Sequence, residues 1–527
     1  MLNGRKLYFF LLIYFIILLI PAYWLPLFET TDARYAEISR EMLATGNFLE
    51  PLYNGIKHFH KPPLTYWINA LGLYIFGING FGARFFGSVA AVLTLIYTRK
   101  TAVVLTDDEE TADRTVLILS GSILFLIVSR IVSTDIYLEF FTIAALYYMF
   151  RQTYGAKSRY NALMTGVHLG LGFLTKGPVI FLFTLLPFVT ALFFSREHRR
   201  AFGLKDFLLG LAVFLVISLP WYIYVVIAEP GLLRYFLVVQ TVDRVATNKF
   251  ERSKPIYFFF MVFFGTFIPW IFYFLRNWKF ADKMKTGKIL YLYILMPFIV
   301  FELSTSKLGT YILPFYPAAA LIAALNMDSK WLERLSAAIL LLLGIAAAVA
   351  PFVKDFVHPY ANILVPFGIF YFLLSVWVIF GKRLTVRSFT YMVLLFTLAA
   401  YCFVPLIGPY VKGYRMQCDD IKKFDPTGRY NVLIYRTFLP VISFYLNDVK
   451  PIAFARERET QFQTEEDYKR YLIESDEDLN AYLKKNPELI LISRYDTDKE
   501  FEERTGYTCT LISVRGGDKK AFFCKAP

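Results

Sequence analysis

The feature that most constrains this chain is a long series of apolar runs, each close to the length of a bilayer-spanning helix. The first run covers roughly residues 7–28 and carries almost no charge. Further runs lie near residues 85–105, 115–130, 138–150, 160–175, 178–194, 207–228, 256–275, 288–303, 311–325, 335–352, 360–380 and 388–409. Because roughly 20 apolar residues cross the hydrocarbon core, we expect a polytopic α-helical membrane protein with about thirteen transmembrane helices.

Composition excludes an ordinary soluble protein. Of the 527 residues, 57% are hydrophobic and only 19% are charged, which is more apolar material than soluble domains can bury. The first run begins like a signal peptide, but it is too long and no small-x-small cleavage site follows it. We therefore expect it to remain as a helix.

The positions of the cations predict the orientation. If Arg5 and Lys6 are cytoplasmic, every second loop should be rich in Lys and Arg. The expected basic loops carry Arg99, Lys100 and Arg114; Arg151, Lys157 and Arg159; Arg196, Arg199, Arg200 and Lys205; Arg276, Lys279, Lys283, Lys285 and Lys288; Lys330 and Arg334; and Lys382, Arg383 and Arg387. Thirteen spans then put the C-terminus outside. The net charge of +14 is thereby explained without a nucleic-acid partner.

Cations on the outer side have no such explanation. They are Arg34, Lys57, Lys61, Arg84, Lys176, the segment from Arg234 to Lys254, and Lys307. Charges near membrane depth are costly and usually functional. If these loops converge on one cavity, they would bind an anion such as phosphate.

The first outer loop, residues 29–84, has its own structure. "YAEISREML" has an apolar face at helical spacing and predicts a helix lying at the membrane interface. An "NG" turn, a rigid "KPP" and a second, aromatic-rich helix follow, and Pro62 restricts Lys61 to an extended backbone. We expect Asp32 to point into a polar chamber, or to cap the helix, and Glu37, Arg40 and Glu41 mostly to face water.

Five stretches resemble a known family. They are "DARYAEISREMLATGNFLEPLYNGIKHFHKPPLTYWINA" (32–70), "STDIYLEF" (133–140), "GLGFLTKGP" (170–178), "VVQTVDRVA" (238–246) and "SKLGTYILPFYPAAALI" (306–322). They are similar to segments of the membrane-embedded GT-C glycosyltransferases, and in particular of the bacterial aminoarabinose (4-amino-4-deoxy-L-arabinose) transferases that modify lipid A. That group is related to the protein O-mannosyltransferases. The likeness covers roughly the first 330 residues.

The resemblance implies an enzyme and its substrates. The donor would be a sugar on undecaprenyl phosphate, the acceptor a lipid A phosphate on the periplasmic face of the inner membrane, and the reaction inverting. Asp32 and Asp135 match the family's acids, while Lys61, Arg244 and Tyr311 match positions that hold the lipid phosphate. The family has a glutamate before the "KPP" lysine, and here it is His60, which puts the sugar in doubt.

The chemistry explains why cations are needed. Cleavage between the anomeric carbon and phosphate leaves an oxocarbenium-like centre and growing charge on the phosphate, which fixed cations stabilise. Besides Lys61 and Arg244, we expect the substrate-binding set to include Lys176, Lys307, Arg34 and Tyr66. A hydroxyl acceptor would need a general base, for which Asp32 is the candidate. A phosphate acceptor is already ionised, and Asp32 would then orient a substrate.

Other roles are open for several of these residues. Lys61, Lys176 and Lys307 could be lysines that reach to the interface, Tyr66 an interfacial aromatic, and Asp135 a helix cap. A divalent metal ion could bind His58 and His60, which share a face if extended, although two histidines are few for a metal site.

The last 115 or so residues predict a second domain. We divide the chain into a membrane domain (1–409) and a periplasmic α/β domain (410–527), with some parallel strands. Residues 431–435, 451–455 and 489–493 are the expected strands, and 465–473, 478–486 and 499–506 the expected helices. A closing hairpin turning at Gly516–Gly517 would put Cys509 opposite Cys524, so that a disulfide could form there or at Cys418.

Two other functions stay open. The sugar could go to a protein or another glycan, as in the O-mannosyltransferases. The chain could instead be a lipid flippase or transporter, but we find no internal repeat, and the charges gather on the outer side rather than at mid-membrane.

Overall fold

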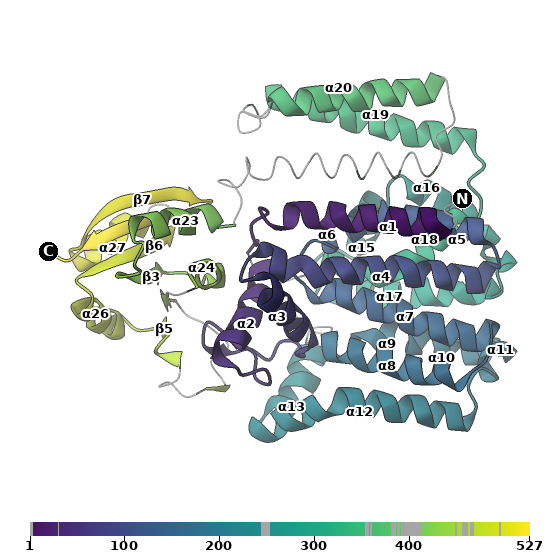
Figure 1. Ribbon diagram of the computed structural model, residues 1–527, viewed down its shortest axis with the longest axis horizontal. Helices are drawn as coiled ribbons and strands as arrows, with labels where there is room; N and C mark the ends of the chain where they lie inside the picture. Colours follow the sequence, from purple (N-terminus) through teal and green to yellow (C-terminus); the bar gives the residue numbers. More distant parts are fainter. Residues whose placement is uncertain are drawn as a thin grey trace.

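The computed structural model describes residues 4–29, 31–243, 253–353, 358, 361–380, 386, 390, 394, 413–447, 451–455, 462–463, 468–494 and 497–527. A bundle of helices leads into a mixed sheet with helices at the C-terminal end (Figure 1). The predicted boundary at residue 409, the predicted run 388–409 apart from Thr390 and Leu394, and the predicted phosphate-binding residue Arg244 lie outside the described residues.

Most predicted apolar runs form helices of the bundle. The longer ones are α1 (Gly4–Leu19), α4 (Gly80–Thr106), α5 (Glu109–Ser120), α7 (Thr134–Tyr154), α8 (Arg159–Lys176), α12 (Leu204–Ala228), α17 (Leu290–Leu303), α19 (Lys330–Val353) and α20 (Ala361–Phe380). Shorter elements complete it: η1 (Ile20–Ala22), α6 (Ile123–Val128), α9 (Val179–Phe183), α10 (Leu185–Phe194), α11 (Arg196–Arg199), α13 (Leu232–Arg234), η2 (Tyr235–Asp243), α15 (Phe258–Thr266), α16 (Trp270–Asn277), η3 (Trp278–Lys283), η4 (Gly287–Ile289), η5 (Gly309–Phe315) and α18 (Tyr316–Ala324).

The bundle supports the prediction of a membrane protein, but the described part of the chain shows fewer candidate membrane spans than the thirteen that the sequence predicted. Within the described residues, four helices are long and apolar enough to cross a bilayer, namely Gly4–Ala22, Gly80–Thr106, Leu204–Ala228 and Lys330–Val353. A fifth span is possible if the bent pair formed by α15 and α16 is counted as one. Several predicted runs are broken: the run 115–130 divides at Gly121 and Ser122, and the run 178–194 divides at Thr184.

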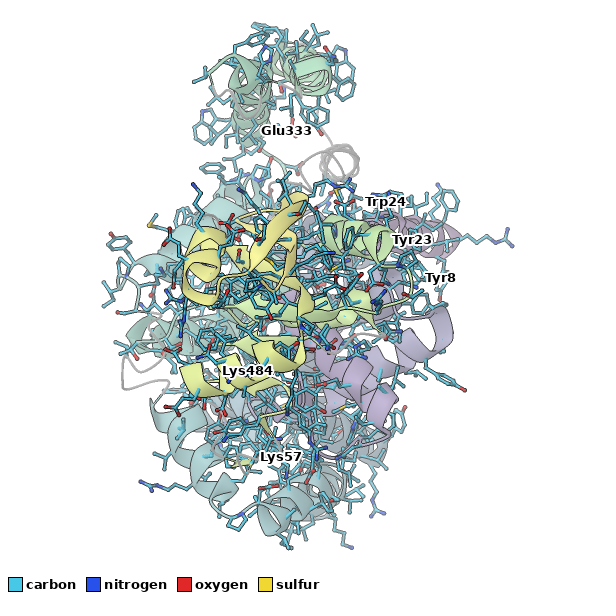
Figure 2. The ribbon with its side chains drawn as sticks, turned by 90° about the vertical axis from the view of Figure 1, so that its left-hand side faces the viewer. Tyr8, Tyr23, Trp24, Lys57, Glu333 and Lys484 are labelled. Carbon is cyan, nitrogen blue, oxygen red and sulfur yellow. A yellow bond between two sulfur atoms is a disulfide. The ribbon has the colours of Figure 1, made fainter. Side chains whose placement is uncertain are left out.

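Aromatic side chains mark the outside of the bundle. Tyr8, Tyr23 and Trp24 project outward on one side of the molecule (Figure 2), and all three are exposed. Exposed aromatics near a helix end are typical of the membrane interface.

The pair α19 and α20 lies at the edge of the bundle, as Figure 1 shows.

The first outer loop folds as predicted into two helices and a turn between them. α2 (Thr31–Thr45) and α3 (Leu64–Phe76) flank a hairpin of β1 (Leu52–Tyr53) and β2 (Ile56–Lys57). The turn residues Asn54 and Gly55 both have positive φ, at 50° and 76°. This is the backbone that an Asn-Gly pair favours in a two-residue hairpin.

The C-terminal part contains a six-stranded sheet in the order β5-β4-β3-β6-β8-β7. β3 (Asn431–Tyr435) is parallel to β4 (Ile452–Phe454) and β6 (Glu488–Arg494), while β7 (Thr508–Gly516) and β8 (Lys519–Lys525) are antiparallel neighbours. The helices are α23 (Arg415–Phe424), α24 (Pro440–Leu446), α26 (Asp476–Lys485) and α27 (Thr497–Thr505). The predicted mixed α/β arrangement is present.

One expected helix in this part is wrong at its C-terminal end, while residues 465–467 lie outside the described residues. The predicted helix 465–473 ends in strand β5 (Leu472–Ile473), because both residues are buried and extend the sheet by pairing in parallel with Ala453 and Phe454 of β4. Periodicity alone does not distinguish so short an apolar pair from the end of a helix.

The closing hairpin has its turn one residue later than predicted. β7 and β8 meet at Gly517–Asp518, with Gly516 paired to Lys519. Two register shifts along β7 then bring Cys509 opposite Cys524, and the two form a disulfide. The pairing is therefore as predicted although the turn is not. Cys418 is buried and not disulfide-bonded.

Candidate active site

Asp32 lies at the start of α2 and is buried, with 2% of its surface exposed. Its carboxylate forms an ion pair with Arg84 of α4 and accepts hydrogen bonds from the backbone N–H of Val132 (2.6 Å) and of Phe28 (3.1 Å). Arg84 also donates to the carbonyls of residues 25, 26 and 130, at 2.7, 2.8 and 2.9 Å. Asp32 thus ties α2 to α4 and lines no cavity described below. The expectation that it points into a polar chamber stays a prediction.

The rest of the dense charge on α2 is also internal. Glu37 is fully buried, and Arg40 and Glu41 are each 9% exposed. Arg40 donates to both oxygens of Glu37, at 2.8 and 2.7 Å, while Glu41 accepts from the backbone N–H of Gly55 at 2.9 Å. The prediction that these charges face water is wrong, because α2 is packed against the C-terminal part, where Arg40 reaches Asn447.

Burial raises the pKa of both α2 glutamates. The pKa of Glu37 rises from 4.5 to about 7 because burial disfavours its charged form, although Arg40 opposes the shift. The pKa of Glu41 rises from 4.5 to about 8, again through burial and then through the charge of Glu37. These groups therefore titrate near neutral pH inside the protein.

A small polar cavity of about 100 Å³ lies next to α2. Residues from five parts of the chain line it: Thr31, Arg34, Tyr35, His58, His60, Lys61, Ser133, Thr134, Asp135, Lys176, Leu308 and Tyr311. Among these described lining residues, Asp135 alone is acidic, whereas Arg34, Lys61 and Lys176 are cationic. The cavity is suited to an anionic ligand.

Three predicted site residues meet on one wall of this cavity. Asp135 stands in the first turn of α7, where its backbone N–H donates to Ser133 Oγ at 3.2 Å. Its carboxylate pairs with Lys176, the last residue of α8. The Lys176 ammonium also lies 4.8 Å from the centre of the Tyr311 ring. Asp135 is therefore neutralised by a lysine that itself faces the cavity.

The loop after the hairpin also lines the polar cavity. Lys61 follows His58 and His60, whose ring centres are 4.1 Å apart, and His60 also lies against the ring of Tyr235 at 6.2 Å. In the described part of the chain, no group of three or more His, Cys, Asp or Glu side chains could hold a metal ion. Two imidazoles fall short of the three or four protein ligands usual for zinc.

A larger, mostly apolar cavity of about 670 Å³ adjoins the polar one. It runs between the ends of α8 and α12, the elements α9, α13 and η2, and α17, and its lining includes Phe173, Val179, Leu182, Leu219, Tyr222, Ile223, Val226, Leu233, Phe236, Leu237, Val300 and Phe301. His60, Lys61, Lys176 and Tyr311 line both cavities. Cations therefore stand where the apolar cavity meets the polar one, which suits a ligand with an apolar tail and an anionic head.

The remaining predicted residues divide between the cavity and the protein interior. Arg34 lines the polar cavity and lies 5.4 Å from the Tyr53 ring centre. Tyr66 is buried and does not line the polar cavity. It stacks on Tyr35, which does, with 5.4 Å between the ring centres. Lys307 lines neither cavity.

Lys307 instead forms a buried ion pair. Its ammonium lies 2.8 Å from Glu302 and donates to the carbonyl of Pro255 at 3.1 Å. Glu302 also accepts from the backbone N–H of Phe259 at 3.1 Å, at the start of α15. The pair joins the loop before η5 to the segment before α15, which gives Lys307 a partner within the protein; that it binds a phosphate stays a prediction.

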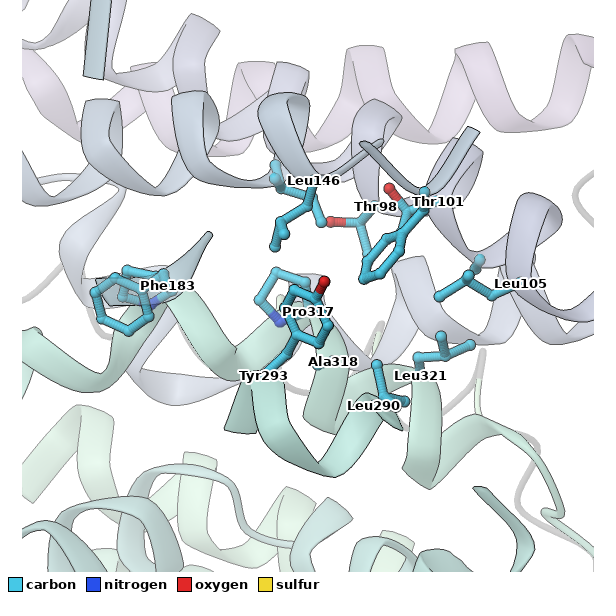
Figure 3. A pocket seen from close by; sticks show the side chains of 14 residues that line it. Thr98, Thr101, Leu105, Leu146, Phe183, Leu290, Tyr293, Pro317, Ala318 and Leu321 are labelled. Atoms are coloured by element: carbon cyan, nitrogen blue, oxygen red, sulfur yellow. The ribbon is translucent and has the colours of Figure 1, made fainter. Parts of the chain in front are cut away.

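A third, much smaller cavity lies away from this site. Its volume is about 30 Å³, and Figure 3 shows it enclosed by Thr98 and Thr101 of α4, Leu146 of α7, Tyr293 of α17 and Pro317 of α18. That is room for a single water molecule. It has no charged lining residue among those described, so it is not the active-site candidate.

The sequence did not predict some of the residues that line the polar cavity. Thr31, Tyr35, Ser133 and Thr134 are neutral and stand beside the acids that drew attention instead. Glu302 was missed as the partner of Lys307, although an acid at the end of an apolar run is a signal in itself.

Comparison with known proteins places this geometry in context. The profile of the dolichyl-phosphate-mannose-protein mannosyltransferase family matches residues 6–236. An uncharacterized protein of Aquifex aeolicus is 28% identical over 83% of this chain and 85% of its own length. An enzyme of Edwardsiella ictaluri, named undecaprenyl phosphate-alpha-4-amino-4-deoxy-L-arabinose arabinosyl transferase, is 31% identical over 62% of this chain. The match spans only 60% of that enzyme's length.

The fold comparison covers nearly the whole chain. The crystal structure of ArnT from Cupriavidus metallidurans bound to undecaprenyl phosphate has a TM-score of 0.85 and 20% identity, over 99% of this chain and 98% of that one. At this identity the likeness shows the fold. The chain is therefore an ArnT-like protein in fold, and its first part is similar in sequence to the aminoarabinose transferases, as its first outer loop predicted.

Proposed function

We propose that this chain is an inverting glycosyltransferase of the bacterial inner membrane. It takes a sugar, 4-amino-4-deoxy-L-arabinose by similarity, from undecaprenyl phosphate and transfers it to a lipid A phosphate on the periplasmic face. The observation that carries the proposal is the boundary shared by the two cavities, where Lys61, Lys176 and Tyr311 line both. The names of the similar enzymes support the choice of donor and acceptor.

The larger cavity accounts for the donor. Its walls are almost entirely apolar and match a polyprenyl tail, while Lys61 and Lys176 stand at its polar end. With the phosphate between these lysines, the sugar enters the polar cavity. As the bond from the anomeric carbon to phosphate breaks, the lysines stabilise the growing charge on the leaving phosphate. We propose that Arg244, which lies outside the described residues, adds a third cation.

The polar cavity favours an acceptor that is already ionised. A hydroxyl acceptor needs a base; the one acid among the described lining residues, Asp135, is paired with Lys176, so a base here would have to be an imidazole, His58 or His60. Asp32 is held by Arg84 and two backbone N–H groups. A phosphate acceptor needs no base near neutral pH, because its second pKa is about 6. Arg34, which lines the cavity, would bind it, and Asp135 would orient the sugar.

We also propose the topology that the positive-inside rule indicates. About thirteen helices cross the membrane, the N-terminus is cytoplasmic, and the domain after residue 409 is periplasmic. The disulfide between Cys509 and Cys524 supports an oxidising compartment for that domain.

A transfer assay tests the function. Purified full-length protein is given undecaprenyl phosphate carrying radiolabelled aminoarabinose, together with lipid A. We expect label on lipid A and a single anomeric configuration in the product, inverted relative to the donor. Label on protein or another glycan would replace the acceptor but keep the donor. Lipid movement across vesicles without label transfer would favour a flippase and contradict the proposal.

A further inference from the structure

The hairpin of β1 and β2 is held by residues of the C-terminal domain. The Gln463 side chain makes two hydrogen bonds to its backbone: Oε1 accepts from the N–H of Lys57 at 2.9 Å, and Nε2 donates to the carbonyl of Gly55 at 2.8 Å. One amide side chain thus pairs with the hairpin much as a neighbouring strand would. Lys57 stands four residues before Lys61, at the cavity boundary.

The neighbouring residue makes a second contact. The Phe462 ring meets Phe59 edge-on at 5.6 Å and meets Tyr235 in the same way at 5.2 Å. Phe59 lies between the two cavity histidines in sequence, and Tyr235 stacks against His60 at 6.2 Å. Phe462 therefore joins the loop that carries Lys61 to η2, the element that leads toward Arg244.

Three more contacts hold the hairpin. Tyr471 packs so tightly against Gly55 that a Cβ there would be 2.1 Å from its ring, so the position requires glycine. From the side of α2, Glu41 accepts from the Gly55 N–H at 2.9 Å. Lys57 also forms an ion pair with Glu229, which follows α12. The hairpin is enclosed between the membrane part and the C-terminal domain.

We infer that Phe462 and Gln463 are positioning residues for the donor phosphate: the C-terminal domain sets the place of the loop with His58, His60 and Lys61. This inference rests on the proposed function, because it assigns the phosphate to Lys61. A lysine is a point charge on a flexible stem, so its backbone must be fixed if its ammonium is to meet a phosphate in one place. Neither residue is among the described residues that line the polar or the large apolar cavity, so each acts through this loop.

Binding of undecaprenyl phosphate to the full-length protein in detergent tests the inference. We expect Phe462→Ala and Gln463→Ala each to weaken binding by on the order of tenfold, because a small displacement of a positioned group has large effects. Phe462→Leu keeps the apolar contact and should recover most of the affinity. The control is Phe523→Ala, a partly buried phenylalanine of the same domain that packs against Phe424 and Tyr430. It should leave the affinity unchanged.

Hydrogen exchange provides a second readout that does not need the lipid. In both alanine variants, amides of residues 55–61 should exchange faster, while the sheet strands β3 and β6 keep their protection. If the wild type binds undecaprenyl phosphate and both variants bind equally well with unchanged exchange at 55–61, the inference is wrong and the proposed function stands. If the wild type fails to bind, both are wrong. Equal loss of protection in β3 and β6 would indicate general unfolding and also overturn the inference.

Discussion

Four buried charges of α2 and the cations of the polar cavity, which include Arg34 of the same helix, lie side by side, and they differ in what they face. On α2, Asp32, Glu37, Arg40 and Glu41 are buried and closed upon partners within the protein. The cavity cations Lys61, Lys176 and Arg34 come from separate segments and face a space that a ligand can enter. Charge density along a sequence therefore does not locate a site. What matters is whether the charged groups line a space that a ligand can enter.

This comparison predicts that loss of one of the buried α2 charges harms stability, whereas loss of a cavity charge harms turnover. The largest effect should come from Asp32→Ala. It leaves Arg84 buried without its carboxylate, which costs about 3–5 kcal/mol. We expect a markedly lower melting temperature and a lower yield from membranes. The double variant Asp32→Ala/Arg84→Leu removes both charges and should recover part of that loss. Normal stability of Asp32→Ala with abolished transfer would contradict our division and restore Asp32 as a catalytic group.

Lys61→Ala should be the complementary case. We expect the transfer rate to fall by about 10²–10³-fold, the size found when one group that stabilises a developing oxyanion is removed. The melting temperature should change little, because Lys61 is only partly buried at the cavity boundary. Lys61→Arg should retain part of the activity. Full transfer by Lys61→Ala would remove the donor site from this boundary.

Stability should fall as pH rises through neutrality, through the α2 glutamates. Their folded pKa values, about 7 for Glu37 and about 8 for Glu41, lie above the ordinary glutamate pKa of 4.5. The folded state therefore binds more protons than the unfolded state between about pH 4.5 and 8, and its stability decreases as pH rises through that window, by at most about 1.4 kcal/mol per pH unit for each group. Melting temperatures from pH 5 to 9 measure this.

The matched variant for this pH effect is Glu41→Gln, which fixes that group in a neutral form. Its melting temperature should depend less steeply on pH than that of the wild type. A wild-type profile that rises from pH 5 to 8 would show that these glutamates are not buried as described.

The smallest effect is expected for Arg34→Ala, which distinguishes acceptor binding in the polar cavity from donor binding at the boundary between the two cavities. Arg34 lines only the polar cavity, so Arg34→Ala should raise the KM for the acceptor about tenfold, comparable to losing one hydrogen bond to a charged group. Binding of undecaprenyl phosphate should be unchanged. Steady-state transfer kinetics with each substrate varied in turn measure this effect. An equal loss of affinity for the donor would contradict separate binding places for donor and acceptor.

The sequence predicted the parts of this molecule that rest on local patterns. The helices of the first outer loop, its Asn-Gly turn and strands β3, β4 and β6 follow from periodicity and turn chemistry. The family likeness and the surplus of outer cations, rather than a local pattern, predicted that Lys61, Lys176 and Tyr311 share a site, and the three residues line both cavities.

What the sequence did not predict depends on tertiary packing. The neutralisation of Asp32 by Arg84 joins residues 52 positions apart, and the pairing of Lys307 with Glu302 requires the loop before η5 to fold back. The burial of Glu37 and Glu41 depends on the C-terminal domain covering α2, which no pattern within α2 indicates. The turn of the last hairpin lies one residue later than predicted. The two register shifts in β7 that accompany it leave no mark in the alternation of apolar and polar residues along the strand.

The most direct measurement is a structure of the full-length protein with undecaprenyl phosphate. Our account predicts the tail along α9, α12 and α17 in the large cavity, with phosphate oxygens in contact with the ammonium groups of Lys61 and Lys176. A phosphate bound elsewhere, with the large cavity empty of the tail, would contradict it.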